Sequence, residues 1–254
     1  MTDEEKGQRL LTAVERLVSN NTTLRTKVAE AKARATEKAS ELTKKPDSLR
    51  EATAVELIRT FSNNAAIAGG ASAAPALIPG IGSIAVGVAG GIAELAYLLK
   101  TEVELALCLL HLYGFDIEEP KERQIGFLLA SVGTSMASGS NVVGDLIKAE
   151  GVALWNYAPR HIARFVIRAM TAIAMGWVSR SLLRMVPLIG IGVAATMNKV
   201  LTQRVGDRVM RDLRTRRDMI DGDDLPRVKA KAKAKPKSKA GARPTRRAKL
   251  KVVE

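Results

Sequence analysis

The stretch that decides the fold lies between Arg59 and Glu94: TFSNNAAIAGGASAAPALIPGIGSIAVGVAGGIA (60–93) carries no charged side chain. A membrane-spanning helix needs roughly 20 apolar residues, so the run is long enough on paper to cross a bilayer. However, Pro75 and Pro79 interrupt it, and Ala and Gly supply much of its apolar character. The pattern predicts a helical hairpin with its apex at Pro79 and leaves three settings open: buried in a helical body, re-entrant in the bilayer, or interfacial.

Small residues recur at four-residue spacing on both sides of this apex. They are Ala66, Gly70 and Ala74 before it and Ser83, Gly87 and Gly91 after it, with Gly82 near the start of the second helix. A strip of small side chains lets a neighbouring helix approach closely.

A second segment, Val186-Pro-Leu-Ile-Gly-Ile-Gly-Val-Ala, repeats the pattern of Ile78-Pro-Gly-Ile-Gly-Ser-Ile-Ala-Val. Pro187 matches Pro79, and Gly190 matches Gly82. Each proline breaks the chain at an apex, and each glycine lets the next helix begin close to its partner. The sequence therefore predicts two such hairpins.

No segment alternates as a strand would, and aromatic residues make up only 4% of the chain. The expected fold class is all-α: a helical bundle of two Pro/Gly-kinked apolar hairpins with flanking helices and a disordered basic tail. Helices are expected at roughly 3–44, 48–73, 81–112, 120–137, 141–157, 159–185 and 190–217. The expected divisions are an N-terminal helical arm (1–46), a helical domain (47–220) and a Lys/Ala-rich cationic tail (221–254).

The arm carries an apolar or small side chain every three or four residues from Leu10 to Ala35, interrupted by Asn21. This pattern fits two helices that pack on the body, or a coiled coil that forms a homo-oligomer through residues 10–42. The N-terminal sequence lacks the pattern of a secretory signal, so a cytoplasmic location is expected.

The net charge of +14 is concentrated in the tail. Residues 227–254 hold twelve basic side chains and one acidic side chain, or +11, which leaves +3 for the rest. The tail has no aromatic residue to stack on bases, so it is expected to bind anionic lipid, nucleic acid or an acidic partner without sequence specificity. Its candidate polyanion-binding residues are Lys229, Lys231, Lys233, Lys235, Lys237, Lys239, Arg246 and Arg247.

A polar stripe runs along the predicted helix 81–112. Its members, at three- or four-residue spacing, are Glu94, Tyr97, Thr101, Glu104, Cys108 and His111. Buried carboxylates need partners, and the expected partners are Arg180, Arg184 and Arg204. The alternatives are a solvated face, or proton or solute handling by Glu94 and Glu104 in a membrane-embedded bundle.

The sequence contains no catalytic constellation. Gly80-x-Gly82 lacks the preceding strand and the third glycine of a dinucleotide fingerprint, and no P-loop is present. A metal site at Glu104, Cys108 and His111 would need a fourth ligand from elsewhere. We therefore expect no enzyme activity, no cofactor and no metal.

Two segments resemble the EcsC family of bacterial proteins: IPGIGSIAVGVAGGIAELAYLLKTEVELALCLLHLYGFDIEEPKER (78–123) and VPLIGIGVAATMNKVLTQRVGDRVM (186–210). The chain departs from the family pattern at Phe115, where Tyr is usual, and at Asp207. The family's recurrent positions correspond to Pro79, Gly82, Tyr113, Gly114, Pro187, Gly190, Asn198, Arg204 and Gly206. The resemblance implies a companion of an ABC transporter and supplies no catalytic residue.

These patterns predict a non-enzymatic, membrane-associated accessory or scaffold protein on the bacterial cytoplasmic face. It would dock through its Ala/Gly-rich helical hairpins, with the polybasic tail on anionic lipid or an acidic partner, and would be peripheral or partly inserted at the cell membrane. The alternative is a soluble helical protein whose C-terminal tail binds nucleic acid non-specifically.

Overall fold

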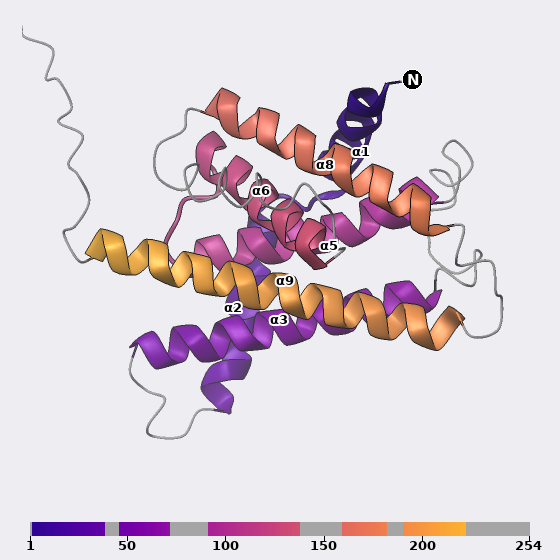
Figure 1. Ribbon diagram of the computed structural model, residues 1–254. Coiled ribbons are helices and arrows are strands. Elements are labelled where there is room, and N and C mark those ends of the chain that lie inside the picture. Colours follow the sequence, from indigo (N-terminus) through magenta and orange to yellow (C-terminus); the bar gives the residue numbers. More distant parts are fainter. Residues whose placement is uncertain (1, 39–45, 72–90, 138–158, 182–189, 222–254) are drawn as a thin grey trace, which may run out of the picture.

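The computed structural model describes residues 2–38, 46–71, 91–137, 159–181 and 190–221. Within these residues it contains helices and no strands, which confirms the all-α prediction (Figure 1). The helices are α1 (Asp3–Leu17), α2 (Asn21–Glu37), α3 (Pro46–Ala71), α5 (Gly91–Leu112), α6 (Pro120–Ala137), α8 (Pro159–Ser181) and α9 (Gly190–Asp221).

Several predicted features lie outside the described residues. They are both hairpin apices with Pro79, Gly82 and Pro187, the small residue Gly87, the helix expected at 141–157, and the basic tail. The glycines Gly91 and Gly190 are the first residues of α5 and α9.

Local sequence signals account for several helix ends. The Thr2 hydroxyl accepts a hydrogen bond from the Glu5 amide, and the Glu5 carboxylate accepts one from the Thr2 amide, a capping box that starts α1. Asn20 caps α2 in the same way, through the Thr23 amide. Gly114 follows α5 with φ of +90°, a left-handed conformation that glycine adopts without strain at the end of a helix.

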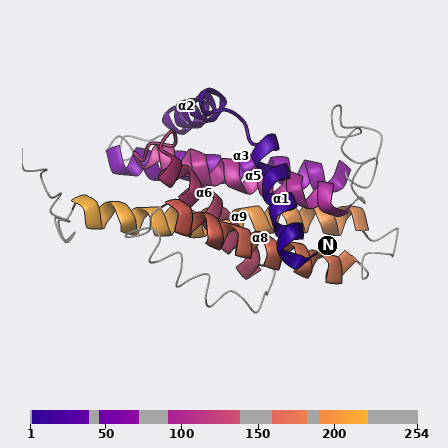
Figure 2. The same cartoon turned by 90° about the horizontal axis from the view of Figure 1, so that it is seen from above.

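Helix α5 is the axis of the molecule, because it contacts each of the other six described helices. Its side chains from residue 101 to 110 are buried around the whole circumference, including two glutamates, Glu102 and Glu104. A helix that is apolar nearly all round belongs in the interior, and here the other helices surround it (Figure 2).

The N-terminal arm packs on the body. The seam residues Leu10, Val14, Leu24, Val28 and Ala31 are buried in one core cluster with α5, α6, α8 and α9. The first of the two alternatives for the arm therefore describes its packing within the chain. The side chains that would form a coiled-coil seam are already covered.

Contacts along α9 show in which direction the neighbouring helices run relative to it. A Cβ added at Gly206 would lie 2.7 Å from Ile58 of α3 and 3.0 Å from Leu105 of α5, so three helices meet closely at this glycine. Farther along, Arg214 pairs with Glu51 at 2.7 Å, which makes α3 antiparallel to α9.

Helix α5 runs parallel to α9, and α6 runs antiparallel to both. Leu105 lies beside Gly206, and farther along both helices Arg217 donates to the carbonyl of Tyr113, just after α5, at 2.7 Å. Both helices therefore advance in the same direction. Gly126 of α6 adjoins Leu107, whereas Thr134, two turns later, reaches back to Glu102. In both views the C-terminal ends of α3 and α8 and the N-terminal ends of α5 and α9 lie at the right of the molecule (Figures 1 and 2).

Candidate functional site

One end of the bundle is almost free of charge. Three helices reach it through stretches without Asp, Glu, Lys or Arg: 60–71 of α3, 169–179 of α8 and 190–198 of α9. We call these three stretches the charge-poor end. The helices that end or begin there flank 72–90 and 182–189, the segments that hold Pro79 and Pro187.

Large apolar side chains are exposed at this end. Ile67 is 71% exposed and Met197 is 54% exposed, and because α3 and α9 are antiparallel, both lie about 13 Å beyond the Ile58–Gly206 contact. Met175 of α8 is also exposed. A group of exposed apolar side chains indicates a surface that meets an apolar partner.

The first turn of α1 borders the charge-poor end. Lys6 Nζ lies 3.7 Å from Met175 Sδ, and Lys6 also pairs with Asp3 at 2.9 Å. The neighbouring Glu4 and Glu5 add negative charge at this edge. The border is therefore acidic and does not favour contact with anionic headgroups.

The opposite end is rich in charge, and we call 199–221 of α9 the charged end. Several of its arginines have structural partners. Arg216 forms a bidentate pair with Glu122 at 2.6 and 2.7 Å, and its guanidinium lies 4.0 Å from the Phe115 ring centroid. Arg208 pairs with Asp212 at 3.4 Å. The Arg216 contacts join α9 to α6 and to the turn after α5, whereas the Arg208–Asp212 pair lies within α9, so much of this basic character is used within the fold.

The start of α8 is amphipathic. Arg164 and Arg168 are exposed, whereas Ile162, Val166 and Ala169 are buried. The side chains of Arg160 and His161 lie outside the described residues, as do those of Glu94, Arg180 and Arg184.

The stripe on α5 faces the N-terminal arm, which corrects the predicted partners. Glu104 accepts hydrogen bonds from Lys27 Nζ at 2.6 Å and from the Ser19 amide at 2.8 Å, and it pairs with Lys100 at 3.2 Å. Arg204 is exposed instead. The reason is geometric: Leu105 faces Gly206 of α9, and Glu104 is rotated about 100° away from it.

Burial and pairing act in opposite directions on Glu104. Burial raises its pKa, but the hydrogen bonds from Lys27 and Ser19 and the charge of Lys100 lower it further, so the net pKa lies below its ordinary value. Glu104 is therefore a buried, ionised anchor for the arm.

The remaining stripe residues have structural contacts. The Cys108 thiol lies 3.6 Å from the Leu24 carbonyl, and burial raises its pKa to about 12, so the thiol is inert. Thr101 donates to the Tyr97 carbonyl at 3.0 Å. Burial and the nearby Arg25 lower the pKa of His111. Among the described residues, no group of three or more His, Cys, Asp and Glu side chains is placed to hold a metal ion.

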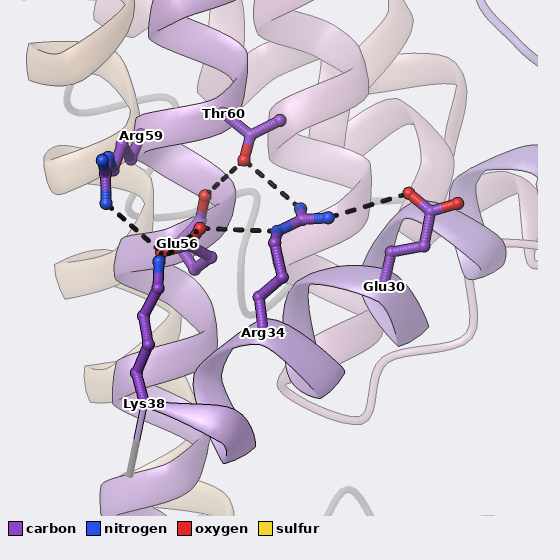
Figure 3. A network of polar contacts seen from close by, with 6 residues as sticks. All are labelled: Glu30, Arg34, Lys38, Glu56, Arg59 and Thr60. Atoms are coloured by element: carbon purple, nitrogen blue, oxygen red, sulfur yellow. Dashed lines mark hydrogen bonds and ion pairs between the residues drawn. The ribbon is translucent and has the colours of Figure 1, made fainter.

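A second network fastens α2 to α3 (Figure 3). Glu56 pairs with Arg34 at 3.4 Å and with Lys38 at 3.0 Å, and Arg34 also reaches the Thr60 hydroxyl at 3.4 Å. Hydrogen bonding from Lys38 is the largest cause of the lowered pKa of Glu56. The arm is thus held by charge at two places, Glu56 and Glu104.

Glu102 is the buried residue that sequence reasoning missed. Its side chain is fully buried and contacts Thr134 of α6, and its Oε1 has no hydrogen-bond partner. Burial raises its pKa to about 8. The Thr134 hydroxyl also lies 2.8 Å from the Ala130 carbonyl. The Thr134 hydroxyl has one hydrogen and faces two acceptors, Glu102 Oε2 and the Ala130 carbonyl.

A signal for Glu102 was present in the sequence. Glu102 and Glu104 lie two positions apart in a helix that is otherwise apolar all round, so they point about 200° apart. One stripe cannot hold both. Because the only polar stripe of this helix holds Glu104, Glu102 falls on an apolar side and had to be buried.

No helix in the described part of the chain combines the length and the apolar character needed to cross a bilayer. Comparisons with protein-family models, with curated proteins and with solved structures gave no match. The resemblance to the EcsC family therefore stays a prediction from its motifs.

Proposed function

We propose that this chain is a membrane-associated accessory or scaffold protein without catalytic activity, in keeping with its EcsC-like motifs, and that the charge-poor end is its membrane-facing surface. The observation that carries the proposal is the coincidence of two features at that end. Exposed apolar side chains such as Ile67 and Met197 lie where the helices meet the uncharged segment 72–90 and the segment 182–189, which contains Pro187 and one charged residue, Arg184.

The position of α9 separates two modes of attachment. Its 32 residues span about 48 Å, and the chain leaves it at Asp221, at the end far from Ile67. Electrostatic attraction to a lipid surface decays over about 10 Å. When the charge-poor end meets the bilayer and α9 points away from it, Asp221 is therefore outside that range. The tail is then available to an acidic partner on the cytoplasmic side.

Vesicle flotation of the full chain and of a variant ending at residue 226 tests the proposal. Vesicles of neutral phosphatidylcholine and vesicles containing phosphatidylglycerol are compared at low and high salt. Attachment by the charge-poor end predicts that both proteins float with neutral vesicles and that salt does not release them. A carbonate wash of cell membranes then separates an inserted hairpin, which resists it, from a peripheral contact.

Two outcomes would contradict the proposal. Neither protein floats with any vesicle, or flotation requires anionic lipid and disappears with the tail. The second outcome would leave the tail as a polyelectrolyte, and DNA binding with a steep salt dependence would then support the nucleic-acid alternative.

A further inference from the structure

A cavity of about 410 Å³ lies between α1, α6 and α8, apart from the charge-poor end. Its apolar lining includes Leu11, Phe127 and Val166, which are all buried members of the core. The volume falls within the range of roughly 300–1,000 Å³ that is typical of small-molecule pockets. The size and the apolar floor fit a small ligand with an apolar part.

Three polar side chains complete the lining. Each has a charge or a hydrogen-bonding atom that no contact among the described residues satisfies. Arg123 Nη1 donates to the Asn21 side chain at 2.9 Å, but no carboxylate among the described residues pairs with this guanidinium. Glu15 of α1 likewise has no cationic partner within the described part of the chain. Gln124 Oε1 is buried and has no hydrogen-bond donor.

These groups differ in the chemistry that they require. A guanidinium with free N–H groups takes a carboxylate. The Glu15 carboxylate and Gln124 Oε1 are both acceptors, so together they suit a group that carries several N–H donors and a positive charge, such as an ammonium. A buried acceptor without a donor costs about 1–3 kcal/mol, and such a ligand would remove that cost at Gln124.

We propose that this cavity binds a free α-amino acid with an apolar side chain. The ligand's carboxylate pairs with Arg123, its ammonium lies between Glu15 and Gln124 Oε1, and its side chain packs against Phe127 and Val166. The inference does not depend on membrane attachment, because none of the residues that line the cavity belongs to the exposed apolar group at the charge-poor end.

Isothermal titration of the full chain with L-leucine and L-phenylalanine tests the site. Two analogues remove one charge each: N-acetyl-leucine lacks the ammonium, and leucinamide lacks the carboxylate. Both are expected to bind at least about tenfold more weakly than leucine, the effect of losing a hydrogen bond to a charged group. L-lysine is expected to bind weakly, because its charged side chain would face the apolar floor.

The variants Glu15→Gln and Arg123→Gln identify the site. Glu15→Gln is expected to weaken the binding of leucine and of leucinamide, which keep the ammonium, and to leave N-acetyl-leucine unchanged. Arg123→Gln is expected to weaken the binding of leucine and of N-acetyl-leucine, which keep the carboxylate, and to leave leucinamide unchanged. Glu15 is exposed, so its variant keeps the fold, and Glu4→Gln, on the same helix but away from the cavity, is the matched control. No heat with either amino acid at millimolar concentration would overturn the proposal. Equal binding by Glu15→Gln and wild type, or tighter binding of a fatty acid such as laurate, would also overturn it.

Discussion

The two ends of the bundle differ in the side chains that α9 presents there. At the charged end, α9 is held by ion pairs and hydrogen bonds, of which the Arg216–Glu122 pair is the most buried. At the charge-poor end the same helix carries no charge over 190–198 and exposes Met197. One continuous helix therefore joins a charge-fastened half to an apolar half.

The difference teaches that the basic composition of α9 is not by itself a binding surface. Arg214, Arg216 and Arg217 each contact a residue of α3, α6 or the end of α5. At the charge-poor end, by contrast, Ile67 and Met197 are exposed. The surface that this half offers to a partner is therefore apolar.

Removing the buried pair at the charged end has the largest expected effect. Arg216→Met strands Glu122 and is expected to lower the free energy of unfolding by about 3–5 kcal/mol. Arg214→Met removes a pair whose side chains are both about half exposed, and it should cost less than about 1 kcal/mol. Urea unfolding of the two variants measures this contrast. Equal losses would show that the charged end is not fastened as described.

Raising the pH introduces a charge next to the apolar half, at Glu102. Its folded pKa is about 8 and its ordinary value is 4.5, so folding is favoured below pH 4.5 and this contribution is lost as the pH rises through 8. Wild type should lose on the order of a few kcal/mol of stability between pH 5 and 9 relative to Glu102→Gln, by the same linkage.

Urea unfolding at several pH values measures this slope for both proteins. Glu104→Gln serves as the comparison, because Glu104 is already ionised in the folded state. If the wild type and Glu102→Gln gave parallel profiles over this range, the neutral state assigned to Glu102 would be wrong.

Gly206→Ala tests the close approach where the two halves meet. The added Cβ would lie 2.7 Å from Ile58 Cγ1, and overpacking of this kind costs about 1–3 kcal/mol. The double variant Gly206→Ala/Ile58→Ala removes Cγ1 and Cγ2 of Ile58, the atoms that clash, so its loss of stability should be smaller than the sum of the two single losses. A stability unchanged by Gly206→Ala would place α3 and α9 farther apart than described.

Ile67→Lys should have the smallest effect on stability and a clear effect on attachment. Ile67 is exposed, so its replacement should change the free energy of unfolding by less than about 0.5 kcal/mol. Vesicle binding should weaken about tenfold, which corresponds to a loss of about 1.4 kcal/mol. Val55→Lys is the matched control, since Val55 is 56% exposed on the same helix, about 18 Å away from Ile67 and outside the charge-poor end.

Much of the fold could be predicted from the sequence, because the helix periods and the Gly114 cap are local signals. The apolar spacing over residues 10–35 predicted correctly which side chains of the arm are buried. The spacing could not predict which helices cover them. The ion-pair partners of Glu104 were predicted wrongly for the same reason. Lys27 and Glu104 lie 77 positions apart, and only the packing of α2 on α5 brings them together.

The most direct measurement places an environment-sensitive fluorophore at two positions on α3, one inside the charge-poor end and one outside it. The single cysteine, Cys108, is buried, so a Cys108→Ala background allows labelling at Ile67→Cys or at Val55→Cys. The account predicts that vesicles shift the emission of the probe at 67 to the blue and leave the probe at 55 unchanged. An equal response at both positions, or a response at 55 alone, would contradict attachment through the charge-poor end.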